Sequence, residues 1–178
     1  AEFFDFAADL PTLRSRLDKT AARFTVQCHR VRLLLDPDGR VAIESTPFRT
    51  PPEPVQVTLA RHPVSSADQF LYHKTTRRSI YRAARAACSN YDDVILFNEH
   101  HEITESTVAN VVVEIQGNLY TPPVDCGLLA GTFRSHLLDC GSVTERRIRL
   151  PELLAADRVL LANSVRGLYP AKLTLSST

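Results

Sequence analysis

The residues that could do covalent chemistry in this chain are a lysine and a glutamate. Lys74 follows a short apolar run, and a lysine amine that is partly removed from water can form an imine with a carbonyl group. Glu105 stands just before a β-branched run, where its carboxylate could accept a hydrogen bond from a protonated pyridinium nitrogen. Taken alone, Lys74 fits a surface lysine and Glu105 fits a capping or turn residue. Glu99 and Glu102 are nearby alternatives.

Two polar turns further along the chain could bind a phosphate group. Gly131 precedes a predicted helix, so Gly131, Thr132 and Phe133 would offer backbone N–H groups at the helix start. Asn163 and Ser164 follow an apolar strand and could add a hydroxyl and an N–H group. Each turn alone is equally typical of an ordinary loop. An amine, a carboxylate and two such turns, in this order, are the parts needed to bind and use pyridoxal 5'-phosphate (PLP).

Composition and charge exclude several other classes of protein. The net charge of +1 over 178 residues gives no electrostatic reason to expect a nucleic acid or an anionic membrane as partner. There is no signal peptide and no apolar stretch of about 20 residues, which favours a cytoplasmic location. The four cysteines form no CxxC pair, so we expect reduced thiols and no metal site. Arginines between residues 77 and 85 alternate with apolar residues and predict a solvated helix face.

The elements that must position these residues form an α+β pattern. We expect a small α+β region over residues 1–68 and a larger PLP-binding region over residues 69–178, with Lys74 near their junction. The helices are predicted over residues 9–24, 75–87, 131–140 and 151–156. The strands are predicted over residues 31–35, 41–43, 55–60, 93–97, 108–115, 119–121, 143–148 and 158–161. Because the chain contains no Met and opens at Ala1, we expect it to be part of a longer polypeptide.

With these residues placed, residues 70–168 resemble the class IV, or fold-type IV, PLP-dependent enzymes. Lys74 matches the lysine that binds the cofactor covalently, and Glu105 matches the partner of the pyridine nitrogen. Further matches are Thr104, Asn110, the stretch Tyr120–Pro123, Leu129, the stretch Gly131–Arg134 and Ser164. The resemblance implies that Leu129 packs on the cofactor ring. It also implies that residues 131–134 and 164 hold the phosphate, although Phe133 stands where the family commonly has a threonine.

The family resemblance also implies an architecture. It predicts a small N-terminal α/β sandwich region and a larger C-terminal pseudo-barrel region, joined in a homodimer. The family normally opens with a segment whose arginine binds the phosphate. Nothing before residue 9 matches that segment, so we expect the small region to be incomplete.

Within the family, residues 73–78 and 163–167 look most like the lyase-type domain. They are similar to the domain fused behind aminodeoxychorismate synthase component I in bifunctional para-aminobenzoate synthases. The resemblance therefore implies a 4-amino-4-deoxychorismate lyase that releases 4-aminobenzoate and pyruvate and is fused to, or partnered with, that synthase. The alternatives are a branched-chain or D-amino-acid transaminase and a non-catalytic scaffold or dimerisation domain. Arg166 is a candidate partner for a substrate carboxylate, or else a surface arginine.

Overall fold

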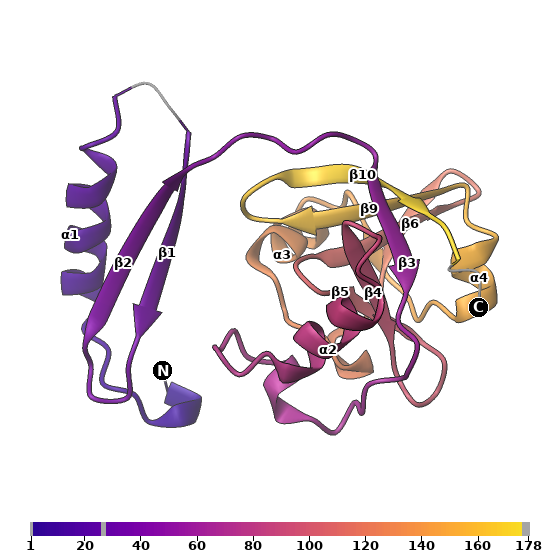
Figure 1. Ribbon diagram of the computed structural model, residues 1–178, viewed down its shortest axis with the longest axis horizontal. Helices are drawn as coiled ribbons and strands as arrows, with labels where there is room; N and C mark the ends of the chain where they lie inside the picture. Colours follow the sequence, from indigo (N-terminus) through magenta and orange to yellow (C-terminus); the bar gives the residue numbers. More distant parts are fainter. Residues whose placement is uncertain (1, 26–27, 176–178) are drawn as a thin grey trace. The chain divides into compact units, whose positions relative to one another are not determined.

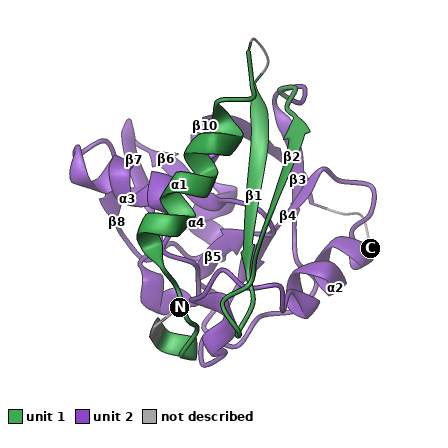
Figure 2. Cartoon of the chain, turned by 90° about the vertical axis from the view of Figure 1, so that its left-hand side faces the viewer, with its two compact units in different colours: residues 1–50 green, residues 51–178 purple. Residues whose placement is uncertain are grey.

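The computed structural model describes residues 2–25 and 28–175, which fall into two compact units. Residues 1–50 form the first unit and residues 51–178 the second (Figure 2). The sequence placed a boundary at residues 68–69, whereas the compact units divide between Thr50 and Pro51. The reason is β3 (Val55–Leu59), which pairs in parallel with β4 and β10 of the second unit. Lys74 consequently lies inside the second unit and not at its edge along the chain.

The first unit contains one helix and one hairpin. Helix α1 (Leu10–Ala21) begins after Asp9, whose side chain accepts a hydrogen bond from the backbone of Thr12, as expected for a residue that caps a helix. The two strands β1 (His29–Leu35) and β2 (Val41–Pro47) pair in antiparallel fashion. A short 3-10 helix, η1 (Glu2–Phe4), precedes them. The predicted helix and hairpin are both present.

The second unit is built around a closed barrel of six strands (Figure 1). The strand order is β5-β4-β3-β10-β9-β6, and pairing of β5 with β6 closes the barrel. The barrel strands after β3 are β4 (Asp93–Phe97), β5 (Ile103–Ser106), β6 (Asn110–Ile115), β9 (Arg158–Asn163) and β10 (Gly167–Leu173). Strands β7 (Asn118–Thr121) and β8 (Thr144–Glu145) extend the sheet beyond β6. The pseudo-barrel predicted for this region is confirmed.

Short helices connect the strands. They are η2 (Gln69–Leu71), α2 (Ser79–Ala87), η3 (Val124–Cys126), α3 (Thr132–Asp139) and α4 (Leu150–Leu154). Helix α2 begins at Ser79, so residues 72–78 are irregular where a helix was predicted from residue 75. Among the described residues, none of these helices, nor α1, is long and apolar enough to cross a membrane.

Two of the barrel strands were not predicted. Strand β5 carries three polar residues in a row, at positions 104–106, which hides the apolar alternation on which strand prediction depends. Strand β10 contains Pro170 and Lys172, which are atypical of a strand. Both strands are held by pairing to neighbours that the sequence does predict, chiefly β4, β6 and β9. Fully buried side chains such as Val94, Val111 and Leu161 fill the barrel core.

Candidate active site

Lys74 lies in the irregular segment between η2 and α2. Leu71 is buried in the core, and the Tyr72 hydroxyl donates a hydrogen bond of 2.6 Å to the backbone carbonyl of Ser66. These contacts fix the start of the segment. The Lys74 side chain itself is exposed, and its positive charge lowers the pKa of Glu105. The structure therefore brings the predicted amine and carboxylate within electrostatic range of each other.

Glu105 is a buried acid on strand β5. Only 5% of it is exposed, and its Oε1 accepts a hydrogen bond of 2.6 Å from the Tyr81 hydroxyl. Burial raises the pKa of Glu105 from 4.5 to about 7. Hydrogen bonds from Tyr81 and from the backbone of Leu129 oppose that rise, as do the charges of Arg78 and Lys74. Glu105 is thus on a strand and not in a turn, and it titrates near neutral pH.

Strand register places Asn110 beside Glu105. The two residues are paired across β5 and β6, and Asn110 is paired in turn with Ala162 on β9. The Asn110 side chain donates a hydrogen bond of 2.8 Å to the carbonyl of Leu129, which lies just before α3. Leu129 is half-buried. Asn110 therefore ties the carboxylate side of the candidate site to the loop that leads into α3.

The start of α3 faces the turn between β9 and β10. The hydroxyls of Thr132 and Ser164 lie 2.7 Å apart, and both residues are exposed. No side chain caps the N-terminus of α3, so its first N–H groups are available to an anion. Asn163 accepts hydrogen bonds from the backbones of residues 165 and 166 and donates one to the Tyr169 hydroxyl. The two turns predicted to bind phosphate are thus adjacent.

Gly131 is the point of closest approach in this region. A Cβ atom at this position would lie 2.1 Å from Oδ1 of Asn110, which is far inside van der Waals contact. The backbone of Gly131 has negative φ, so the requirement for glycine is steric and not conformational. Asn110 and the start of α3 can therefore approach each other only because residue 131 has no side chain.

Phe133 and Arg134 have mainly structural contacts. The Phe133 ring packs near Gly167, where an added Cβ would lie 3.5 Å from the ring. Arg134 is 2% exposed and donates hydrogen bonds to the carbonyl of Pro122, at 2.8 Å, and to the carboxylate of Glu145. A direct role of Phe133 toward a cofactor stays a prediction that rests on its backbone N–H.

Arg166 is neither at the surface nor free. Its side chain is 10% exposed, it pairs with Glu53 at 2.9 Å, and its guanidinium stacks 3.8 Å above the ring of Tyr169. Arg166 therefore does bind a carboxylate, but one that belongs to this chain. Its assignment to a substrate carboxylate stays a prediction.

The sequence interpretation did not assign Tyr81 or Arg78 to the site. Arg78 was predicted to lie on a solvated helix face, which is wrong: it is half-buried, donates to the carbonyl of Thr107 and stacks 4.2 Å above the Tyr81 ring. The signal for Tyr81 was available. Tyr81, Ala84 and Cys88 recur at helical spacing and form the inward face of α2, and a buried tyrosine hydroxyl requires a partner.

These residues fit PLP. The cofactor has an anionic phosphate, a ring nitrogen and an aldehyde, and the chain offers a counterpart to each. Those counterparts are an uncapped helix start with two hydroxyls, a buried carboxylate, and an exposed lysine near that carboxylate. The close approach of Asn110 to Gly131 shows that the phosphate end and the ring-nitrogen end belong to one packed structure.

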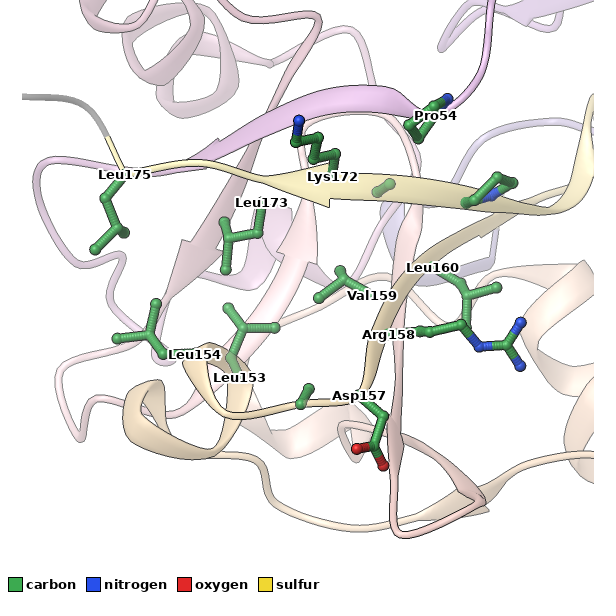
Figure 3. Close-up of a pocket in the computed structure, with 13 residues that line it drawn as sticks. Pro54, Leu153, Leu154, Asp157, Arg158, Val159, Leu160, Lys172, Leu173 and Leu175 are labelled. Atoms are coloured by element: carbon green, nitrogen blue, oxygen red, sulfur yellow. The ribbon is translucent and has the colours of Figure 1, made fainter.

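A separate pocket of about 410 Å³ lies on another part of the second unit (Figure 3). Its wall is formed by α4, β9 and β10 and is mostly apolar, with Leu153, Leu173 and Leu175 among its lining residues. None of the candidate site residues lines it. We therefore do not assign the pocket to the PLP site.

Comparison with known proteins agrees with this geometry. Residues 1–173 match the family described as amino-transferase class IV. The chain therefore belongs to the class IV aminotransferase family, whose fold-type IV architecture it shares. A crystal structure from Mesorhizobium loti, provisionally called an amino-acid aminotransferase, is 35% identical and superposes with a TM-score of 0.89. The match covers 97% of this chain and 86% of that one.

Curated relatives carry names from two branches of the family. A Schizosaccharomyces pombe protein, provisionally named an aminodeoxychorismate lyase, is 34% identical over 77% of this chain and 63% of its own length. A Thermotoga maritima protein, provisionally named a branched-chain-amino-acid aminotransferase, is 29% identical over 80% of this chain and 56% of its own length. The chain thus spans little more than half the length of these relatives.

Proposed function

We propose that this chain supplies the PLP-binding barrel of an aminodeoxychorismate lyase, which converts 4-amino-4-deoxychorismate to 4-aminobenzoate and pyruvate. One observation carries the proposal: a buried glutamate near neutral pKa lies within electrostatic range of Lys74. Membership of the class IV family supports the cofactor. The name of the S. pombe relative supports the choice of a lyase.

When bound, PLP supplies an electron sink that stabilises negative charge on the substrate carbon next to the amine. Lys74 would attach the cofactor through its Nζ. Once displaced by the substrate amine, the same Nζ would act as general base and accept the proton from that carbon. Glu105 would hold a proton at the ring nitrogen, which keeps the ring electron-poor.

The start of α3 would bind the phosphate and fix the orientation of the cofactor. The N–H groups of residues 132–134 have no side-chain cap, and the Thr132 and Ser164 hydroxyls already lie within 2.7 Å of each other. Two hydroxyls and a helix N-terminus together favour a dianion. Leu129, half-buried between Asn110 and α3, would pack on the ring.

A transaminase is the second candidate, and the names of the T. maritima and M. loti proteins favour it. It would use the same Lys74 and Glu105. The difference lies in where Lys74 returns its proton: to the cofactor carbon in a transaminase, with release of a keto acid. Because the two reactions use the same base and the same acid, a measurement of products must separate them.

The test is to load the protein with PLP, supply aminodeoxychorismate and follow pyruvate through lactate dehydrogenase. We expect pyruvate release, and none from Lys74→Ala; Lys19→Ala, on α1 of the first unit, is the matched control and should behave as wild type. Amino transfer to 2-oxoglutarate without pyruvate would instead establish the transaminase. Lys74→Ala should also lack the visible absorption that PLP gives when joined to a lysine. A wild type with no such band and no affinity for PLP would indicate a scaffold.

We also propose that the chain forms a homodimer and works fused to, or beside, aminodeoxychorismate synthase component I. The proposal rests on resemblance to the family. Light scattering after size exclusion checks the first part. A mass near twice 19.9 kDa would agree with it, and a monomer at micromolar concentration would contradict it.

A further inference from the structure

Tyr81 is a buried residue that touches the proposed acid and has no assigned role. It lies in the first turn of α2, seven positions after Lys74, and is 7% exposed. Its hydroxyl donates to Oε1 of Glu105 at 2.6 Å. A hydrogen bond between two buried side chains on separate elements is a specific arrangement, since each polar group must find its partner inside the protein.

The direction of this hydrogen bond is fixed by chemistry. Burial and the neighbouring Glu105 raise the pKa of Tyr81 far above its ordinary value of 10. Tyr81 therefore keeps its proton at every working pH and can only donate it toward the carboxylate. A donor to a carboxylate stabilises the ionised form. Without Tyr81, burial would push Glu105 further toward its neutral form.

Arg78 fixes the Tyr81 ring in place. Its guanidinium stacks 4.2 Å above the ring and donates to the carbonyl of Thr107, which joins the start of α2 to the loop that follows β5. The positive charge of Arg78 also lowers the pKa of Glu105. Ring, hydroxyl and carboxylate thus form one supported unit.

We propose that Tyr81 is a positioning residue that holds Glu105 in one orientation and keeps it ionised, so that Glu105 can hold the proton of the cofactor's ring nitrogen. The inference rests on the proposed function for its purpose, but the Tyr81–Glu105 bond exists without the cofactor. It couples the proposed acid to α2, the helix that follows the Lys74 segment. The residue acts through Glu105, with no direct contact to substrate required.

The test measures the ionisation of Glu105 in cofactor-free protein. Infrared titration follows the band of the protonated carboxyl group, and Glu105→Gln identifies that band by its loss. Tyr81→Phe keeps the ring beneath Arg78 and removes only the hydroxyl. Because a hydrogen bond to a charged group is lost, we expect the Glu105 pKa to rise by about one unit or more, a tenfold or greater change in ionisation. Tyr72→Phe is the matched control, since it removes a hydroxyl that also bonds at 2.6 Å, to a backbone carbonyl.

An unchanged Glu105 titration in Tyr81→Phe would overturn the proposal. If that variant does not fold, incorporation of 3-fluorotyrosine into the wild type gives a second measurement. The more acidic hydroxyl is a stronger donor and should lower the Glu105 pKa, and no shift or a rise would again overturn the proposal. Failure of the wild type to bind PLP would be a different result: it would refute the proposed function, while the titration alone decides whether Tyr81 controls Glu105.

Discussion

The buried carboxyl of Glu105 should make the stability of the cofactor-free protein fall as pH rises, and Glu105→Gln should remove this effect. The pKa of Glu105 is raised from 4.5 to about 7 in the folded protein. Between these values the folded chain keeps a proton that the unfolded chain has lost. The unfolded state then binds fewer protons, so the free energy of unfolding decreases with increasing pH across this window and levels off above pH 7.

The magnitude follows from the same shift. The difference between 4.5 and about 7, at about 1.4 kcal/mol for each pKa unit, corresponds to about 3 kcal/mol across the whole window. Most of it, about 2 to 3 kcal/mol, should be lost between pH 5 and pH 8. This is a large share of the stability of an ordinary domain. The amide introduced by Glu105→Gln cannot ionise and can still accept a hydrogen bond from Tyr81, so the variant should lack this slope.

Urea unfolding at pH 5 and pH 8, followed by circular dichroism, measures the effect. The quantity of interest is the wild-type change in unfolding free energy between the two pH values minus the change in Glu105→Gln. Glu114→Gln, on the neighbouring strand β6 and paired with Arg158, is the control and should follow the wild type. Parallel pH dependence in wild type and Glu105→Gln would refute the view that Glu105 is a buried acid with a raised pKa.

Three further changes test the rest of the site. Gly131→Ala should cost about 1–3 kcal/mol of stability through overpacking and weaken PLP binding, because the new Cβ would lie 2.1 Å from Asn110 Oδ1; urea unfolding and an absorbance titration with PLP measure the two effects. Ser164→Ala should weaken PLP binding about tenfold or more by removing one hydroxyl at the proposed phosphate site, with unchanged urea unfolding; unchanged affinity would argue against a phosphate there. Arg134→Met should cost about 1–3 kcal/mol in urea unfolding, because the buried carbonyl of Pro122 loses its donor.

The parts of the fold predicted from sequence are those whose signal is local. Asp9 before an apolar helix predicts α1, and a β-branched run predicts β6, and both are present. Strand β5 could not be predicted, because its polar residues 104–106 are buried only through pairing with β4 and β6. Register, which depends on residues far apart in sequence, decides whether a polar residue lies in a turn or inside a barrel.

The candidate site shows the same division. The types and order of Lys74 and Glu105 are visible in the sequence, and so is the glycine at residue 131. Their partners are not. Glu53 binds Arg166 across 113 positions, and Tyr81 reaches Glu105 from a different element. Such pairs require the barrel to close first, so no spacing rule reveals them.

The barrel has a further consequence for how the site works. Glu105, Asn110 and Ala162 lie in register across three strands, and Asn110 reaches the loop before α3. The acid and the phosphate turn are therefore fixed to the same rigid sheet. Lys74 instead lies in an irregular segment, exposed and outside any helix or strand. A base that must first bind the cofactor and then move a proton needs that freedom, whereas the groups that hold the cofactor need to stay still.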